Sequence, residues 1–313
     1  MRIIDRDEVR AKLTYELCIP LVREAMMAFS KGVTRQHLRS ILPLGERGVL
    51  GIMPGALGTD DVFGAKLISV YPGNFALGIQ SHQGVVVLFD GKTGAPVCIV
   101  HAGEITAIRT AAASAVATDA LARPEAHRLA ILGYGEQALT HAHAMTRVRP
   151  ISAITVWGRN PERAQAFAKE ISGTLDLPVT ACDVAEAAVA EADIVCTVTN
   201  ARSPILLGSW LKAGTHLNLV GSSGAGPVEV DNQLVANSRF IADSREGVLT
   251  QGAEFLNAKA AGLVDDSHVV GEIGQVLTGD LEGRQSSDQI TVYKSLGHVV
   301  QDLAAAKALY AAV

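Results

Sequence analysis

A glycine-rich turn is the first feature of this chain whose residue types and spacing suggest chemistry. Gly133, Gly135 and Ala138 follow an apolar run at residues 129–132 and match the pattern G-x-G-x-x-G/A. The first glycine permits a tight turn, the second lets the backbone approach a pyrophosphate, and a small third residue lets the next helix pack closely. The N-terminus of that helix would offer free N–H groups to phosphates. The spacing predicts a dinucleotide site, although an ordinary glycine-capped turn would look the same.

The end of the next expected strand, residues 153–157, bears on which dinucleotide would bind. An acidic residue there would hold the ribose 2′-hydroxyl of NAD. Here the strand is followed by Gly158, Arg159 and Asn160, and Arg163 comes one helical turn later. Guanidinium groups form charge-assisted hydrogen bonds with phosphates, so NADP(H) is expected to be preferred, with NAD(H) possible. The alternative is that both arginines are solvated residues of the helix that begins at Pro161.

Composition narrows the class of protein. With 313 residues, 48% hydrophobic and 19% charged, the chain is expected to form two globular domains. A net charge of −5 and the lack of a basic patch argue against a nucleic-acid partner. No apolar stretch approaches the roughly 18 residues of a membrane span, and the N-terminal residues are too charged for a signal peptide. We therefore expect a cytoplasmic protein without a membrane partner.

The cysteines and histidines do not suggest a metal site. The four cysteines, at positions 18, 98, 182 and 196, are far apart and lack metal-type spacing. His141 and His143 are two residues apart, so on a helix they would point in different directions. No metal is expected.

The first 120 residues show helical and then strand-like patterns. Residues 1–32 are expected to be helical, capped by Asp5, with Leu17, Leu21, Ala25 and Phe29 on one face. Strand-like runs follow, separated by glycine, proline and aspartate turns, at residues 38–42, 48–53, 62–70, 84–89 and 97–101. These runs predict a mainly antiparallel sheet. An alanine-rich helix is expected over residues 104–121.

After the glycine turn, helices and strands alternate. The expected order is helix 161–172, strand 179–182, helix 184–191, strands 194–198 and 216–220, helix 231–236 and strand 239–243, and the C-terminal residues predict a helix, a short strand and a closing helix. This alternation predicts an α/β fold, a Rossmann-type doubly wound parallel sheet, plus a second α+β domain built from both chain ends. The expected domains are residues 119–291 for dinucleotide binding, and residues 1–118 with 292–313 for substrate binding and dimerisation.

Several longer segments together resemble the ornithine cyclodeaminase/mu-crystallin family. They are HLRSILP (37–43), GVLGIMPG (48–55), GAKLISVYPGN (64–74), EITAIRTAAASAVAT (104–118), LGYGEQA (132–138), VWGRNPERA (156–164), NLVGSSG (218–224) and VYKSLGHVVQDLAAAKALY (292–310). The resemblance covers essentially the whole chain. It implies a Rossmann domain joined to a domain through which two subunits dimerise. It also implies NAD(P)-dependent chemistry at the α-carbon and nitrogen of small amino or imino acids.

The resemblance also implies which side chains bind the substrate. Arg39, Lys66 and Arg109 match the family's substrate-carboxylate positions, where guanidinium groups can hold a carboxylate bidentately. Taken alone, each would be an ordinary surface cation. Lys66 is also a candidate general acid for the imine nitrogen, in competition with His82, which falls where the family places a histidine near the cofactor. The alternative for His82 is a structural histidine at the start of a strand.

The cofactor is expected to contact residues at strand ends, in the glycine turn and on two of the expected helices. These residues are Thr110, Gly133, Tyr134, Gly135, Glu136, Gln137, Arg159, Asn160, Arg163, Thr197, Thr199, Val220, Gly221, Ser222 and Ser295.

Ser223 separates two expected reactions. Cyclodeaminases of the family, and the related alanine dehydrogenases, carry an aspartate at this position, whereas ketimine reductases carry serine. A serine hydroxyl cannot serve alone as a base near neutral pH. The sequence therefore predicts NAD(P)H-dependent reduction of a small α-imino acid or cyclic ketimine. The alternatives are ornithine cyclodeamination to proline and ammonia, and a non-catalytic, crystallin-like ligand-binding protein.

Overall fold

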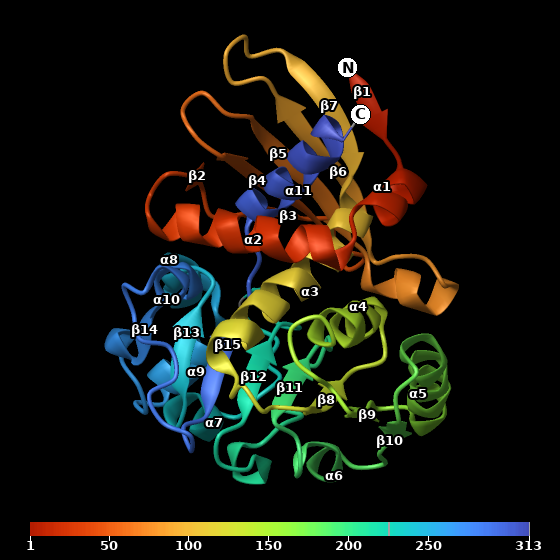
Figure 1. The fold of residues 1–313 in the computed structure, drawn as a ribbon, viewed down its shortest axis with the longest axis vertical. Helices are drawn as coiled ribbons and strands as arrows, with labels where there is room; N and C mark the ends of the chain where they lie inside the picture. The colour runs from red at the N-terminus through yellow and green to blue at the C-terminus, as the bar shows by residue number, and fades with distance from the viewer. Residues whose placement is uncertain (225, 313) are drawn as a thin grey trace. The chain divides into compact units, whose positions relative to one another are not determined.

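The computed structural model describes residues 1–224 and 226–312, and the chain separates into two compact units (Figure 1). Unit 1 comprises Met1–Ala112 and Gly297–Val313, and unit 2 comprises Ala113–Leu296. The alanine-rich helix α3 (Ala102–Leu121) runs from unit 1 into unit 2. Both ends of the chain therefore belong to unit 1.

Unit 1 contains a seven-stranded, mainly antiparallel sheet, in the order β1-β7-β6-β5-β4-β2, with β3 also paired to β4. The strands are β1 (Arg2–Ile4), β2 (Arg35–Gln36), β3 (Ser40–Pro43), β4 (Val49–Ala56), β5 (Phe63–Val70), β6 (His82–Phe89) and β7 (Pro96–His101). The short helix η1 (Pro72–Leu77) lies between β5 and β6, and β1 pairs with β7 in parallel. The antiparallel pairing of the predicted strands is confirmed.

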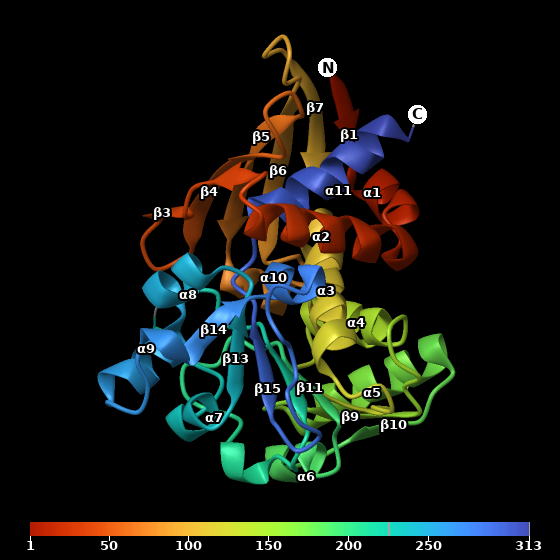
Figure 2. The same ribbon diagram turned by 60° about the vertical axis from the view of Figure 1, so that its left-hand side comes forward.

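Unit 1 also contains the helices α1 (Arg6–Lys12), α2 (Tyr15–Ser30) and α11 (Val299–Ala311), together with the first part of α3. α11 packs against β4, β5 and β6 and against α2, on one face of the sheet (Figure 1 and Figure 2). Glycines permit this close approach. A Cβ at Gly55 would lie 2.6 Å from Val299 Cγ1, and one at Gly64 would lie 3.1 Å from Leu303 Cδ2. Alternate residues of a strand lie on the same face of a sheet, so Lys66, two residues after Gly64 on β5, also lies on the face that α11 covers.

The predicted single helix over residues 1–32 is wrong. Asp5 does cap a helix, accepting a hydrogen bond from Glu8 N at 2.9 Å, but α1 ends at Lys12. Thr14 then caps α2 because its hydroxyl accepts from a backbone N–H of the first turn, a role that breaks the helical run. The buried face of α2 also differs from the predicted one: it consists of Cys18, Ile19, Val22, Ala25 and Met26, and Leu17 is exposed.

Unit 2 contains an eight-stranded parallel sheet, in the order β10-β9-β8-β11-β12-β15-β13-β14. Its strands are β8 (Arg128–Leu132), β9 (Ala153–Trp157), β10 (Val179–Ala181), β11 (Ile194–Thr197), β12 (His216–Leu219), β13 (Arg239–Ala242), β14 (Val269–Glu272) and β15 (Thr291–Lys294). The central strands β11, β12 and β15 are fully buried, as strands covered on both faces should be, whereas the edge strand β10 is partly exposed. The predicted doubly wound α/β fold is confirmed.

The helices of unit 2 are α4 (Glu136–Met145), α5 (Pro161–Leu175), α6 (Ala185–Val189), α7 (Asn232–Ala236), α8 (Arg245–Gln251), α9 (Ala253–Ala260) and α10 (Ile273–Thr278), with the short helices η2 (Gly208–Trp210) and η3 (Asp266–His268). The strand order reverses between β8 and β11. Right-handed crossovers therefore put α4 and α5 on one face of the sheet and α6 on the other. Ligands of such sheets bind at this reversal, beyond the carboxyl ends of the strands.

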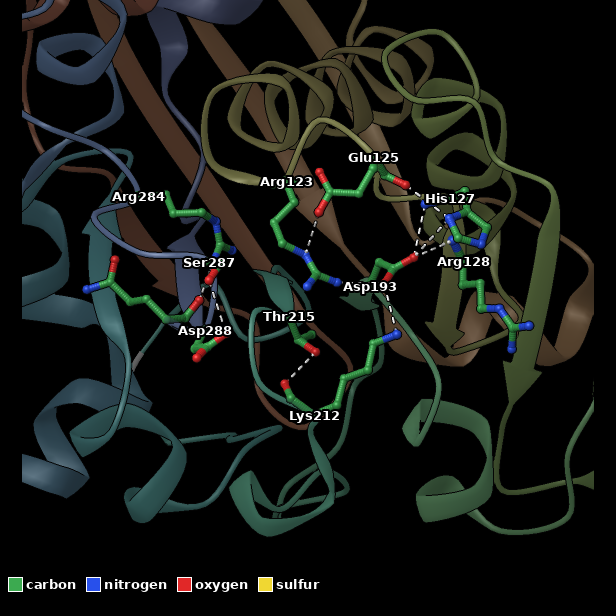
Figure 3. Close-up of polar contacts among 12 residues, drawn as sticks. Arg123, Glu125, His127, Arg128, Asp193, Lys212, Thr215, Arg284, Ser287 and Asp288 are labelled. Carbon is green, nitrogen blue, oxygen red and sulfur yellow. Dashed lines mark hydrogen bonds and ion pairs between the residues drawn. The ribbon is translucent and has the colours of Figure 1, made fainter.

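Asp193 connects several segments at the amino-terminal edge of this sheet, opposite the edge where ligands bind (Figure 3). Its carboxylate lies 2.8 Å from Lys212 Nζ and 3.0 Å from an Arg123 nitrogen, and it accepts from the backbone N–H groups of His127 and Arg128 at 3.0 Å. Burial alone would raise the pKa of Asp193, but these donors outweigh it and lower the pKa to about 2. One carboxylate thus joins the starts of β8 and β11 to the segment before β12.

The chain returns to unit 1 later than predicted. The expected boundary at residue 292 would place β15 outside the parallel sheet, but β15 pairs with both β12 and β13. The unit therefore changes between Leu296 and Gly297. α8, α9 and β14 were not predicted, because none of these short segments shows a clear periodicity.

Two further findings concern the described part of the chain. No helix there is both long and apolar enough to cross a membrane. Nor do its His, Cys, Asp and Glu side chains form a group of three able to hold a metal ion.

Candidate functional site

The glycine turn of unit 2 has the backbone geometry that a phosphate-binding turn requires. Gly133 has φ +135°, a conformation that residues with a Cβ rarely adopt. A Cβ there would also lie 3.0 Å from Val198 O, in the loop after β11. Gly135 caps α4 with extended backbone and offers no side chain to occupy the first N–H groups, and Ala138 is fully buried. The turn therefore leaves the N-terminus of α4 open to an anion.

The residues after β9 follow the strand end directly, and Tyr134 from the glycine turn packs against them. A Cβ on Gly158 would lie 2.1 Å from Tyr134 Cδ1, so the tyrosine ring packs against the glycine backbone. Asn160 caps α5 and accepts from Arg163 N at 2.8 Å, which gives its side chain a structural task. Arg159 and Arg163 are exposed. The residues that directly follow β9, Gly158 to Asn160, include a guanidinium group and no carboxylate, and Glu162 is the acidic residue in the first turn of α5.

Glu229 is a buried residue that the sequence analysis missed. Its Oε1 accepts from Thr199 N at 2.6 Å and from Thr199 Oγ1 at 2.7 Å, and its Oε2 accepts from Gly221 N at 2.7 Å. Burial raises the pKa of Glu229, whereas the Thr199 donors oppose that shift. One carboxylate therefore holds the loops after β11 and β12, which carry several of the predicted cofactor residues.

A buried ion pair supports the same loops. Lys294 Nζ lies 2.9 Å from Glu254 Oε2, and both side chains are fully buried. Lys294 also donates to Ser222 O at 2.5 Å, and Ser222 Oγ donates to Glu254 at 3.4 Å. The hydroxyl of Ser222 is thus used within the protein, whereas Ser223 is exposed. Val220 and Thr197 are also buried.

Ser295, directly after the end of β15, bears on whether unit 2 can bind a dinucleotide. Its hydroxyl is buried and has no hydrogen-bond partner among the described residues. Buried polar groups are normally satisfied, so a partner from outside the chain is expected. Together with the turn at Gly133 and the open N-terminus of α4, this unsatisfied hydroxyl fits a bound dinucleotide.

Unit 1 collects the predicted substrate-binding cations around one acid, Asp302. Lys66 on β5 is 2% exposed, and its Nζ lies 3.0 Å from Asp302 Oδ1. Arg109 on α3 is 4% exposed; its Nε lies 3.1 Å from the same oxygen, and one of its terminal nitrogens donates to Gln301 Oε1 at 2.9 Å. Thr110, next on α3, is also buried. Two of the three predicted cations are therefore held by α11.

Gly297 brings the third cation into this cluster. Arg39 donates to Gly297 O at 3.1 Å. A Cβ on Gly297 would lie 2.8 Å from one Arg109 nitrogen, and the glycine has φ +85°. A side chain here would be strained and would displace the guanidinium. Both Arg39 and Arg109 thus lie close to the backbone of Gly297.

These side chains are named here the cationic cluster (Arg39, Lys66, His82 and Arg109 with Asp302), and in it the pKa values of Lys66 and His82 are lowered. Burial lowers the pKa of Lys66 to about 7, although Asp302 opposes the shift. Burial, followed by the charge of Lys66, lowers the pKa of His82 to about 4. Near neutral pH the His82 ring is therefore neutral, whereas Lys66 titrates. His82 Nδ1 lies 2.9 Å from Ser81 Oγ.

Asp302, Gln301 and Gly297 were not among the predicted site residues. All three lie in the C-terminal segment whose motif includes KSLG and QDL, but the sequence offered no reason to give them a role. Asp302 stands in a mostly apolar helix, and this was the one available signal, because a charged residue is rarely buried unless it is paired.

Known proteins resemble this chain over its whole length. The model of the ornithine cyclodeaminase/mu-crystallin family matches residues 2–313. Ketimine reductase mu-crystallin from Mus musculus is 35% identical over 312 residues, covering 98% of this chain and 96% of the relative.

Two solved structures share the fold. Thermococcus litoralis Δ1-pyrroline-2-carboxylate reductase in complex with NADH and L-proline has a TM-score of 0.96 at 33% identity, covering 99% of this chain and 96% of the other. An archaeal alanine dehydrogenase dimer with bound NAD has a TM-score of 0.92 at 27% identity, covering 99% and 95%. The family match, the identities and the open glycine turn agree, and the chain belongs to the ornithine cyclodeaminase/mu-crystallin family.

Proposed function

We propose that this protein is an NAD(P)H-dependent reductase of a small α-imino acid or cyclic ketimine. The observation that carries the proposal is the cationic cluster, in which Lys66 and Arg109 are buried within 3.1 Å of one carboxylate oxygen. Buried cations need an anionic partner. Three cationic side chains around a single acid leave an excess of positive charge. A second carboxylate, such as that of an imino acid, would neutralise part of it. The relatives support the reaction, since they include a ketimine reductase and a pyrroline-2-carboxylate reductase.

The residues have separable tasks in this proposal. The guanidinium groups of Arg39 and Arg109 hold the substrate carboxylate, which fixes the position of the C=N bond. Lys66 Nζ supplies the proton that the imine nitrogen requires, since its pKa of about 7 suits proton transfer near neutral pH. The glycine turn, Thr199, Gly221 and Ser295 hold the dinucleotide. When bound, the reduced cofactor supplies the hydride.

A substrate panel tests the function. Pyrroline-2-carboxylate, piperideine-2-carboxylate and a linear α-imino acid are each mixed with NADPH or NADH, and loss of absorbance of the reduced cofactor is followed. We expect turnover of at least one of them. Cofactor binding without turnover of any would contradict the proposal and favour a ligand-binding role.

Ornithine is the second substrate to test, because it distinguishes a reductase from a cyclodeaminase. The exposed Ser223 stands where cyclodeaminases of the family carry an aspartate. Ornithine with catalytic NAD+ should release little ammonia and proline. The variant Ser223→Asp should gain this activity, because an aspartate there can handle the substrate amino group. Rapid redox-neutral formation of both products by the unaltered protein would show a cyclodeaminase instead.

We further propose that NADPH binds more tightly than NADH. Arg159 and Arg163 are exposed after β9, at the strand end that faces the ribose in this fold. Arg159→Ala should weaken NADPH binding by about tenfold, as expected for one charge-assisted contact, and leave NADH binding nearly unchanged. Fluorescence titration with both cofactors measures this. Tighter binding of NADH by the unaltered protein would reject the preference.

We also propose that the protein is a homodimer, formed through the face of the unit 1 sheet opposite α11. Phe63 and Leu67 on β5, Ile52 on β4 and Ile3 on β1 are 37–70% exposed, and pairing puts Ile52 beside Leu67 and Phe63 beside Phe89. Such an apolar face marks an interface. The structure of the archaeal alanine dehydrogenase is described as a dimer.

Leu67→Glu should convert this dimer to monomers, because a carboxylate would be buried without a partner. Leu263→Glu, at an exposed leucine of unit 2, is the matched control and should not alter the mass. Sedimentation equilibrium measures both. A dimer that survives Leu67→Glu would place the interface elsewhere.

A further inference from the structure

The buried carboxylate of Asp302 contacts two of the proposed site residues, but no role in the reaction has been assigned to it. Its Oδ1 lies 3.0 Å from Lys66 Nζ and 3.1 Å from Arg109 Nε. The side chain is fully buried, and its Oδ2 has no hydrogen-bond partner among the described residues. The contacts of Asp302 Oδ1 are thus to two side chains of the proposed substrate site, Lys66 and Arg109.

We propose that Asp302 is the positioning residue that keeps Lys66 protonated and in place for proton transfer to the imine nitrogen. The proposal rests on the reductase activity proposed above and adds to it the residue that controls the proton donor.

The surroundings of Lys66 make this control necessary. Burial disfavours a charged Lys66 most strongly, and Arg109 from α3 and Arg39 from the segment before β3 act in the same direction. His82 from β6 is neutral near pH 7, and the thiol of Cys18 from α2, near Arg109 and Asp302, is also neutral because burial raises its pKa to about 12. Asp302 from α11 is the acidic group that acts in the opposite direction. Without it, the ammonium would lie buried beside two guanidinium groups and would lose its proton.

The step that Asp302 supports balances in atoms and electrons. The substrate α-carbon receives a hydride from the dihydronicotinamide while the π bond of C=N breaks. The electron pair of that bond moves to nitrogen, which takes a proton from Lys66 Nζ. Lys66 is left neutral next to Asp302 and regains a proton from water. The substrate is reduced to the amino acid, and the nicotinamide is oxidised.

The test compares Asp302→Asn with Gln301→Leu. Asparagine keeps the shape of the side chain and removes its charge, whereas Gln301→Leu removes a neutral partner of Arg109 and leaves the carboxylate. When kcat is plotted against pH, its fall on the alkaline side should occur at a pH lower by about one unit or more in Asp302→Asn, and activity should recover in acid. In Gln301→Leu, KM should rise, and the alkaline fall of kcat should stay at its original pH. An alkaline fall at the original pH in Asp302→Asn would overturn the proposal, because a merely structural residue would lower activity equally at every pH.

A second measurement does not depend on turnover. Lysines labelled with 13C at Cε report deprotonation by NMR, and the Lys66 signal is assigned by its loss in Lys66→Met. The pKa of Lys66 should fall in Asp302→Asn. If it falls while no protein form reduces any imino acid, the control of Lys66 stands and the proposed function fails. If it does not fall, the positioning role is wrong whatever the activity.

Asp302→Glu covers the case in which Asp302→Asn does not fold. It retains a carboxylate at altered distance, so kcat should be lower while its alkaline fall stays near the original pH. An alkaline fall displaced to lower pH in this variant would contradict the proposal.

Discussion

Replacing Lys66 with methionine should lower kcat for imine reduction by about 10²–10⁴-fold, the range associated with a lost general acid. Methionine fills similar volume in a site that is 2% exposed, but it cannot donate a proton. Binding of the reduced cofactor should be unchanged, since the glycine turn lies in unit 2. Steady-state kinetics and cofactor titration measure the two effects separately.

Two variants control for this result. Lys66→Arg keeps a positive charge, but its guanidinium stays protonated, so substrate binding should recover while kcat stays low. His82→Asn should have a smaller effect, because a ring with a pKa near 4 is neutral at the working pH. If Lys66→Met kept most of its activity while His82→Asn lost it, the proton donor would be His82.

Arg109→Lys should lower kcat/KM by about ten- to a hundredfold, equivalent to roughly 1.5–3 kcal/mol. Lysine retains the charge but loses the planar fork that can bind a carboxylate through two nitrogens. It also loses the contact to Gln301, because its single ammonium cannot reproduce the spacing of the two guanidinium nitrogens bound to Asp302 and Gln301. Kinetics with a saturating reduced cofactor measure the loss, and full activity in the variant would reject the assignment.

Stability must be measured for the same variants. Breaking a buried ion pair can cost about 3–5 kcal/mol of unfolding free energy, which would lower activity indirectly. Gln301→Leu is the matched control, because it removes a buried partner of Arg109 and leaves the guanidinium in place. A loss of kcat/KM in Arg109→Lys that exceeds its loss in Gln301→Leu, at equal thermal stability, identifies a direct contact with substrate.

Much of unit 2 could be predicted from the sequence because its signals are local. The turn at Gly133 follows a buried strand and precedes a helix, and each feature is encoded within about ten residues of the others. The parallel sheet likewise follows from the alternation of short apolar runs with helices. The N-terminal segment shows the limit of this reasoning: α1 and α2 were merged, because the capping of α2 by Thr14 competes with a helical pattern that continues on both sides.

The sequence by itself determined which side chains could carry the chemistry: Arg39, Lys66 and Arg109 stand in recognisable motifs. Only the tertiary structure decided what those side chains contact. Asp302 is 236 positions from Lys66 and 193 from Arg109, and no periodicity or spacing relates residues so far apart. Their proximity arises because α11, near the end of the chain, packs on the glycines of β4 and β5. Burial in that interface then sets the pKa of Lys66, and an amino-acid sequence does not specify burial until the chain has folded.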